Sequence, residues 1–159
     1  MRIAAIAVTL LAPAALCAQD AGGDAAAGET LFARQCVSCH IIADESGEVL
    51  AGRASRTGPN LYQVVGRVPG SREDFNYSRA LEAYGALGVV WEQENLVSYL
   101  LDPNAHLREA LGDAGARSQM AYRVRNEEQA VDIVAYLESF GRADAEDGAE
   151  DGAEDAPAE

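Results

Sequence analysis

The chain has 159 residues, which suits one modest domain, and 48% of them are hydrophobic. Its formal net charge is −14, and all 12 basic residues are arginine because the sequence contains no lysine. A protein that binds nucleic acid through charge needs a basic surface, so this composition argues against nucleic acid as a partner.

Residues 1–18 have the pattern of a secretory signal peptide. Arg2 supplies a minimal positive charge, an apolar run extends from Ile3 to Leu16, and Ala18 is a plausible cleavage point. Pro13 interrupts this run, which is also shorter than the roughly 20 residues of a membrane-spanning helix. We therefore expect export to the periplasm, cleavage near Ala18 and no stable membrane insertion. An uncleaved membrane anchor is the alternative, since Leu16 is bulky for its place before the cleavage point.

A helix is predicted between Asp24 and Cys36. Asp24 is a suitable N-cap, and the alanines after it favour helix formation. Leu31 and Phe32 supply an apolar face. Gly28 inside this helix costs about 1 kcal/mol relative to alanine, so we expect it to have a packing reason such as a close helix crossing.

Residues 36–40 have the sequence CVSCH, the pattern by which a haem is attached covalently to an exported protein. The two cysteines would form thioethers with the haem, and His40 would be the proximal iron ligand. Zinc binding, a redox dithiol and a chance match in a core helix are the alternatives. The only other cysteine is Cys17 and the only other histidine is His106, so no second ligand pair for zinc exists. A dithiol usually accompanies a βαβ pattern, which the sequence does not show.

Residues 41–90 predict little regular structure. Residues 41–57 are polar and contain glycine, which predicts a loop, and residues 58–61 (GPNL) predict a turn. Residues 78–90 contain a possible short helix that Gly85 and Gly88 break. No strand-rich region is expected.

The second half predicts three helices, namely residues 91–101, residues 104–110 with Asn104 as the N-cap, and a terminal helix that Asn126 caps and Gly141 ends. Gln129 lies three residues after Asn126, which predicts a capping box. Residues 112–119 contain glycine and predict a loop that leads to Met120.

A haem iron with two protein ligands needs a second donor besides His40. Met1 would leave with the signal peptide, so Met120 and His106 are the candidates. Met120 follows a loop whose backbone can direct a thioether at the iron, whereas His106 falls in a helical stretch. We expect His40 and Met120 to bind the iron, although core packing is the commoner role of a lone methionine. Two protein ligands leave no open position for oxygen or peroxide, which favours electron transfer over catalysis.

The end of the chain has a different composition. Residues 143–159 are mostly Ala, Gly, Asp and Glu, which predicts a disordered acidic tail. Without this tail and the signal peptide at residues 1–18, one haem domain remains at residues 19–142. We expect no disulfide in it, because Cys17 is removed and the haem uses Cys36 and Cys39.

Several motifs occur in a recognisable order. They are Gly28 and Phe32 before CVSCH, TGPNLY at residues 57–62, Gly66-Arg67, FNYS at residues 75–78, Trp91, Tyr99, Pro103, Met120 and Tyr136. Together they resemble a class I cytochrome c of the longer bacterial type found in photosynthetic and respiratory chains. The resemblance runs from Gly28 to about Phe140. It implies an all-α fold whose helices and loops surround one haem c, bound covalently through Cys36 and Cys39.

The resemblance also implies roles for residues around the haem. Pro59 would offer its carbonyl to the His40 ring and fix its orientation. Arg67, Tyr77 and Trp91 would hold the haem propionates by hydrogen bonds. The alternative for each aromatic residue is simple core packing.

Two further contacts are implied by the same resemblance. Tyr99 would lie near the Met120 sulfur. Gly28 and Phe32 would cross the terminal helix at Ile133 and Tyr136, locking the first and last helices together.

The implied function is that of a periplasmic one-electron carrier and not an enzyme. It would act as a monomer that docks transiently with membrane redox complexes. Electrons would pass from a quinol-oxidising cytochrome bc complex to a terminal oxidase or a photosynthetic reaction centre. The alternatives are a dedicated redox partner of a periplasmic dehydrogenase, and a ligand-binding or peroxidatic haem protein in which Met120 dissociates.

The sequence departs from many relatives in lacking the lysines that surround the haem edge. Arg34, Arg117, Arg123 and Arg125 could replace them as a basic docking face. The alternative is that these arginines are scattered and solvated.

Overall fold

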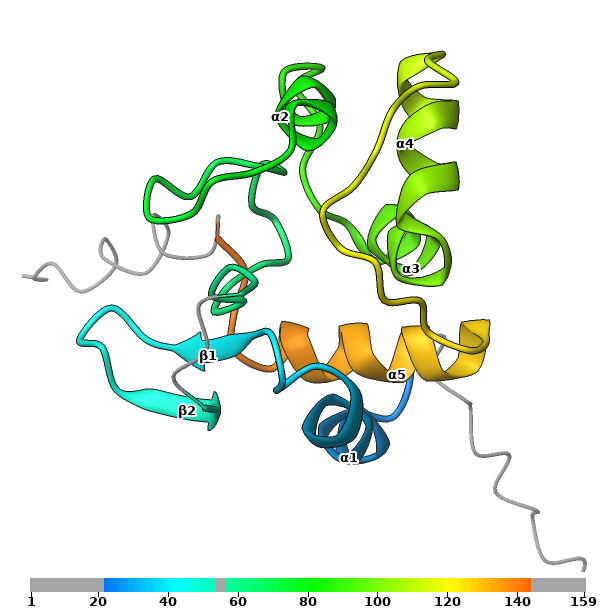
Figure 1. Cartoon of the computed structure of the whole chain (residues 1–159). Helices are drawn as coiled ribbons and strands as arrows, with labels where there is room; N and C mark the ends of the chain where they lie inside the picture. Colours follow the sequence, from blue (N-terminus) through cyan, green and yellow to red (C-terminus); the bar gives the residue numbers. More distant parts are fainter. Residues whose placement is uncertain (1–21, 54–56, 144–159) are drawn as a thin grey trace, which may run out of the picture.

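The computed structural model describes residues 22–53 and 57–143 (Figure 1). The described part contains the helices α1 (Ala25–Gln35), α2 (Arg79–Gly85), α3 (Gln93–Leu101), α4 (Pro103–Leu111) and α5 (Glu127–Glu138), and the strands β1 (Ile41–Ala43) and β2 (Val49–Gly52). The helical fold class is therefore confirmed, with one small sheet added. The predicted signal peptide and the predicted tail beyond Ala143 lie outside the described residues.

The first and last helices cross closely, with α1 running across α5 (Figure 1). Gly28 is buried at this crossing, and a Cβ atom there would overlap the backbone carbonyl of Asp132. One turn later Phe32 packs on Tyr136, with ring centroids 5.5 Å apart. The close crossing of α1 and α5 thus explains why a glycine occupies position 28, as the sequence predicted.

The helix caps agree only in part with the sequence pattern. The Asp24 side chain accepts hydrogen bonds at the start of α1, and Asn126 accepts from the Gln129 N–H at the start of α5, as predicted. The Gln129 side chain turns away from the predicted box and accepts instead from Gln35 Nε2 of α1 at 3.5 Å. Asp102, rather than Asn104, caps α4. The reason is that Pro103 occupies the first helical position, where its missing N–H costs nothing.

The loop predicted for residues 41–57 is wrong in part, because β1 and β2 form an antiparallel hairpin. Asp44 closes its turn by donating its N–H to the Glu48 carbonyl and accepting that residue's N–H on its side chain. Ile42 is fully buried, whereas Val49 and Leu50 are exposed. With one strand facing solvent, the hairpin lacks the alternation of apolar and polar residues that identifies a strand.

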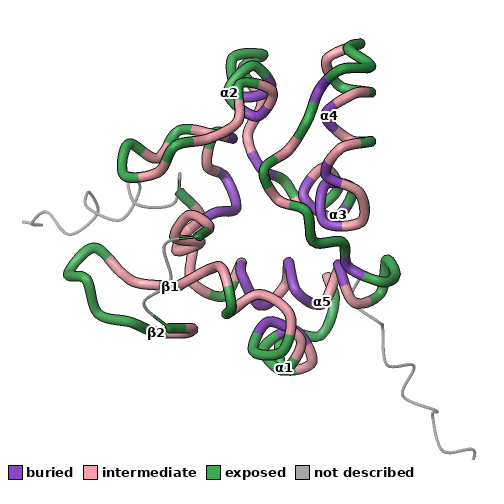
Figure 2. Tube along the Cα trace, in the orientation of Figure 1, coloured by how far each residue is buried: buried purple, intermediate pink, exposed green. Residues whose placement is uncertain are grey.

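The buried residues face the centre of the molecule. Figure 2 shows the buried stretches of α5 turned toward the interior that α3 borders from the other side. The loop before α3 is tied to the preceding segment, since the Trp91 N–H donates to the Arg67 carbonyl and the Gly66 N–H donates to the Trp91 carbonyl. Among the described helices, none is long and apolar enough to cross a membrane.

Candidate functional site

A cavity of about 360 Å³ occupies this interior. All nine residues that the sequence singled out for cofactor binding line it, namely Cys36, Cys39, His40, Pro59, Arg67, Tyr77, Trp91, Tyr99 and Met120. Much of the remaining wall is aliphatic or aromatic, with contributions from α1, α3 and α5. The structure therefore gathers the predicted residues around one apolar space.

The turn that ends α1 carries the first three of these residues. The N–H groups of Cys39 and His40 both donate to the Cys36 carbonyl, at 3.0 and 2.9 Å. Burial, with a smaller contribution from Cys39, raises the pKa of the Cys36 thiol to about 12. A redox dithiol depends on a lowered pKa, so this environment argues against that alternative.

Zinc binding is also disfavoured by what surrounds the two cysteines. Within residues 22–53 and 57–143, no group of three or more His, Cys, Asp or Glu side chains is placed to hold a metal ion. A structural zinc site needs four ligands, usually cysteine and histidine. The cysteines and His40 therefore do not form such a site among the described residues.

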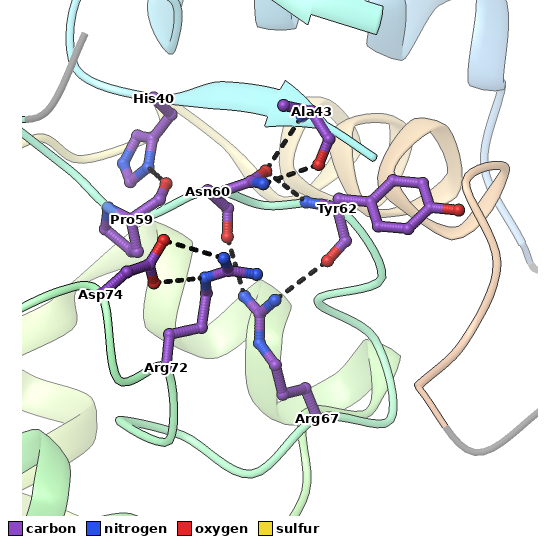
Figure 3. A network of polar contacts seen from close by, with 8 residues as sticks. All are labelled: His40, Ala43, Pro59, Asn60, Tyr62, Arg67, Arg72 and Asp74. Carbon is purple, nitrogen blue, oxygen red and sulfur yellow. Dashed lines mark hydrogen bonds and ion pairs between the residues drawn. The ribbon is translucent and has the colours of Figure 1, made fainter. Parts of the chain in front are cut away.

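The His40 ring is held in one orientation. Its Nδ1 donates to the Pro59 carbonyl at 2.9 Å, as Figure 3 shows. Its face packs on Gly58, where a Cβ atom would lie only 2.5 to 2.9 Å from the ring atoms. Burial lowers the pKa of His40, and the Pro59 carbonyl offsets this only in part. The imidazole is thus neutral with Nδ1 protonated, which leaves the Nε2 lone pair for a metal.

Arg67 brings a positive charge to the cavity wall. Its guanidinium donates to the backbone carbonyls of Tyr62 at 2.9 Å and Asn60 at 3.0 Å (Figure 3). Burial lowers the pKa of Arg67 to about 10, so it remains charged at neutral pH. Nearby Arg72 is ion-paired with Asp74 at 2.8 Å. Because the bonds of Arg67 are to uncharged carbonyls, its charge suits an anionic group in the cavity.

An aromatic wall closes another side of the cavity. Trp91 packs on Tyr99 with ring centroids 5.0 Å apart and on Tyr84 at 5.6 Å. His106 stands behind these rings, with its Nδ1 3.0 Å from the Ser98 hydroxyl, and is not part of the cavity lining. Of the two candidates for the second iron ligand, only Met120 therefore reaches the cavity.

Met120 is placed by a serine that the sequence interpretation missed. The Met120 N–H donates to Ser118 Oγ at 3.0 Å, and the same hydroxyl shares a hydrogen bond of 2.6 Å with Tyr99 Oη. Tyr99, which was expected near the Met120 sulfur, thus bonds through its hydroxyl to Ser118, two residues before Met120. A serine hydroxyl that accepts a hydrogen bond from the backbone N–H two residues later is a known turn motif. The spacing of Ser118 and Met120 could therefore have indicated this contact.

The comparisons with known proteins agree with this arrangement. The cytochrome c family model matches residues 25–141. This chain belongs to the cytochrome c family. It is 53% identical to cytochrome c2 of Rhodovulum adriaticum over 122 residues, which are 77% of this chain and 96% of the relative. It is 44% identical to cytochrome c2 of Cereibacter sphaeroides over 126 residues, 79% of this chain and 86% of the relative.

Solved structures of cytochromes c2 have the same fold. The structure from Rhodobacter sphaeroides matches with a TM-score of 0.71 and 43% identity, covering 74% of this chain and 95% of the other. The structure from Paracoccus denitrificans matches with a TM-score of 0.69 and 33% identity, covering 74% and 96%. As a class I cytochrome c, this protein is an electron carrier with a covalently bound c-type haem.

The cavity of this cytochrome c fits a haem on three physical grounds. Its wall is largely apolar, His40 presents an imidazole nitrogen suited to iron, and Arg67 presents a charge suited to a propionate. The cysteines that would form the thioethers line the same space.

The arginines expected at a docking face are exposed, but they are not equivalent. Arg123 is ion-paired with Asp102 at 3.2 Å, which offsets its charge. Arg34, Arg117 and Arg125 are also exposed, with Arg34 in the last turn of α1. Whether they form one basic face stays a prediction.

Proposed function

We propose that the haem iron of this cytochrome is bound by His40 and Met120 and carries one electron at a time. The observation that supports this most is that both side chains line one cavity, while His40 already uses Nδ1 on Pro59. Histidine and methionine together give a higher reduction potential than two histidines. The haem supplies the one-electron chemistry, and the protein orients the ligands and excludes water.

The propionates are proposed to lie against Arg67, Tyr77 and Trp91. Arg67 and Trp91 are joined through the backbone, because the Trp91 N–H donates to the Arg67 carbonyl at 2.9 Å. Tyr77 is held by Phe75, with ring centroids 4.9 Å apart. Carboxylates buried in a cavity need charged or polar hydrogen-bond donors, and the side chains of Arg67, Tyr77 and Trp91 supply them.

The place of action is proposed to be the periplasm, following the signal pattern of residues 1–18. The protein acts there as a monomer. It takes electrons from a quinol-oxidising cytochrome bc complex and passes them to a terminal oxidase or a photosynthetic reaction centre. Docking is transient and is helped by Arg34, Arg117 and Arg125.

The ligation is tested by a redox titration of the holoprotein and a Met120→Ala variant, followed by absorbance. We expect the variant to lose the sulfur-to-iron charge-transfer absorption in the near infrared, with a fall in midpoint potential on the order of 100 mV. Leu87→Ala, at an exposed position outside the cavity lining, is the control and should keep both properties. If the absorption persists without Met120, another residue binds the iron.

A second measurement separates electron transfer from ligand binding. The parent protein should not bind carbon monoxide near neutral pH, because the two protein ligands leave the iron no free coordination position. Ready binding would favour the ligand-binding or peroxidatic alternative, in which Met120 dissociates.

A further inference from the structure

Asn104 makes a contact that its sequence position did not suggest. It lies in the first turn of α4, but Asp102 caps that helix. The Asn104 Oδ1 atom instead accepts a hydrogen bond of 2.9 Å from the backbone N–H of Ser118. This contact joins α4 to the loop that carries Met120.

Ser118 is thereby fixed at two points. Its N–H is bound to Asn104, and its hydroxyl lies between the Tyr99 hydroxyl at 2.6 Å and the Met120 N–H at 3.0 Å. Tyr99 is only 7% exposed, so it offers a rigid partner on α3. The position of the Met120 backbone therefore depends on helices α3 and α4 together.

The loop is otherwise held by single contacts, among them the Tyr122 hydroxyl donating to Gln35 of α1 at 2.8 Å and the Arg123–Asp102 ion pair at 3.2 Å. Residues 113–123 form neither helix nor strand, so their backbone groups lack a repeating hydrogen-bond pattern. Arg108 Nε donates to the carbonyl of buried Ala116 at 3.3 Å, which is a second tie to α4. Beyond Met120, the Val124 N–H donates to the Leu100 carbonyl at 2.8 Å. Each of these bonds adds to the free energy needed to move the loop.

We propose that Asn104 is a positioning residue that keeps the Met120 thioether on the iron. This inference rests on the proposed ligation by Met120. A foreign ligand can bind the iron only when the loop moves away. Loss of the Asn104 bond makes that movement easier, because the Ser118 N–H then loses its partner in the closed loop.

The test measures the affinity of imidazole for the ferric holoprotein, from the change in haem absorbance. Asn104→Ala should bind imidazole about fivefold more tightly than the parent, which is about 1 kcal/mol at 1.4 kcal/mol per tenfold. Asn104→Asp keeps an acceptor oxygen and should return the affinity to within about twofold of the parent. Arg108→Ala removes the second tie and should shift the affinity in the same direction.

Asn95→Ala is the matched control. On α3, Asn95 Nδ2 donates to the Val90 carbonyl at 2.8 Å and Oδ1 accepts from the Glu92 N–H at 2.9 Å, away from the Met120 loop. Its loss should lower the thermal stability without changing imidazole affinity. If Asn104→Ala and Asn95→Ala increased the affinity for imidazole equally, the cause would be a global loss of stability, and the proposal would be overturned.

The outcomes also separate this inference from the proposed ligation. If Met120→Ala keeps the near-infrared absorption, Met120 is not the ligand and both ideas fail. If that absorption is lost but Asn104→Ala binds imidazole as the parent does, only the positioning role of Asn104 fails.

Discussion

The imidazole of His106 stands edge-on to the ring of Tyr99, with centroids 5.8 Å apart and an interplanar angle of 89°. It meets Tyr84 in the same way at 4.9 Å and 86°. Its Nε2 atom is buried and has no hydrogen-bond partner in the described structure. A histidine behind the haem-facing aromatic wall is therefore best accommodated as the neutral form.

Replacing His106 with phenylalanine should weaken the dependence of stability on pH. Burial lowers the pKa of His106 below its ordinary value of 6.5, with a smaller opposing effect from Glu109. As pH falls below 6.5, the unfolded chain takes up the proton first, so the free energy of unfolding decreases until the folded pKa is passed. Urea unfolding between about pH 8 and pH 5 should show a smaller decrease for His106→Phe. Parallel curves would contradict this. The difference at about pH 8 measures the change in packing together with the lost hydrogen bond to Ser98.

Gly28→Ala should destabilise the protein by about 1–3 kcal/mol or more, because the new Cβ would overlap the Asp132 carbonyl and meet Tyr136. Thermal or urea unfolding of the holoprotein measures this loss. Gly22→Ala is the control, since a Cβ there meets no atom within 4 Å, and it should change the free energy of unfolding by less than about 0.5 kcal/mol. Similar losses in both variants would mean that the helix crossing is not the cause.

Arg67→Ala should lower the midpoint potential. A buried positive charge on the cavity wall favours the reduced haem, and its loss is expected to cost on the order of 1 kcal/mol, or about 40 mV for one electron. Arg72→Ala is the control, because its charge is already paired with Asp74 at 2.8 Å. Redox titration should show a shift less than half as large for Arg72→Ala. Equal shifts would show that the cavity wall gives Arg67 no special influence.

Reduction of the protein by an acidic redox partner should slow as salt is added, because exposed charges are screened. Arg125→Ala should lower the rate at low salt more than Arg123→Ala, since Arg123 is paired with Asp102 at 3.2 Å. Stopped-flow rates at several salt concentrations provide the measurement. A rate independent of salt in the parent would remove electrostatic steering from the proposed docking.

The features that the sequence predicted well depend on neighbouring residues. The CVSCH run places its cysteines and His40 within one turn, and Asp24 and Asn126 cap helices through bonds two or three residues away. The resemblance to class I cytochromes c supplied the more distant members of the cavity, such as Arg67. The lining of one cavity by all nine residues agrees with that resemblance.

The features that the sequence did not predict depend on tertiary contacts. Asparagine is a residue type that often caps helices, but Asp102 caps α4. Asn104 instead accepts a hydrogen bond from the Ser118 N–H, fourteen positions away. Ser118 itself gains its importance from Tyr99 on another helix. Likewise, the β1–β2 hairpin buries Ile42 on β1 but exposes Val49 and Leu50 on β2. Its sequence therefore has no regular alternation of apolar and polar residues that would predict two strands.

The crossing of α1 and α5 bears on the order of events during biosynthesis. The Asp24 N–H donates to the Asp132 side chain at 2.8 Å, across 108 positions of the chain. Such distant partners meet only after the C-terminal helix has been made, and closing so long a loop is slow. The CVSCH run, directly after α1, emerges much earlier. Until α5 has been made, α1 lacks the helix that it crosses, so this crossing cannot restrict access to Cys36 and Cys39.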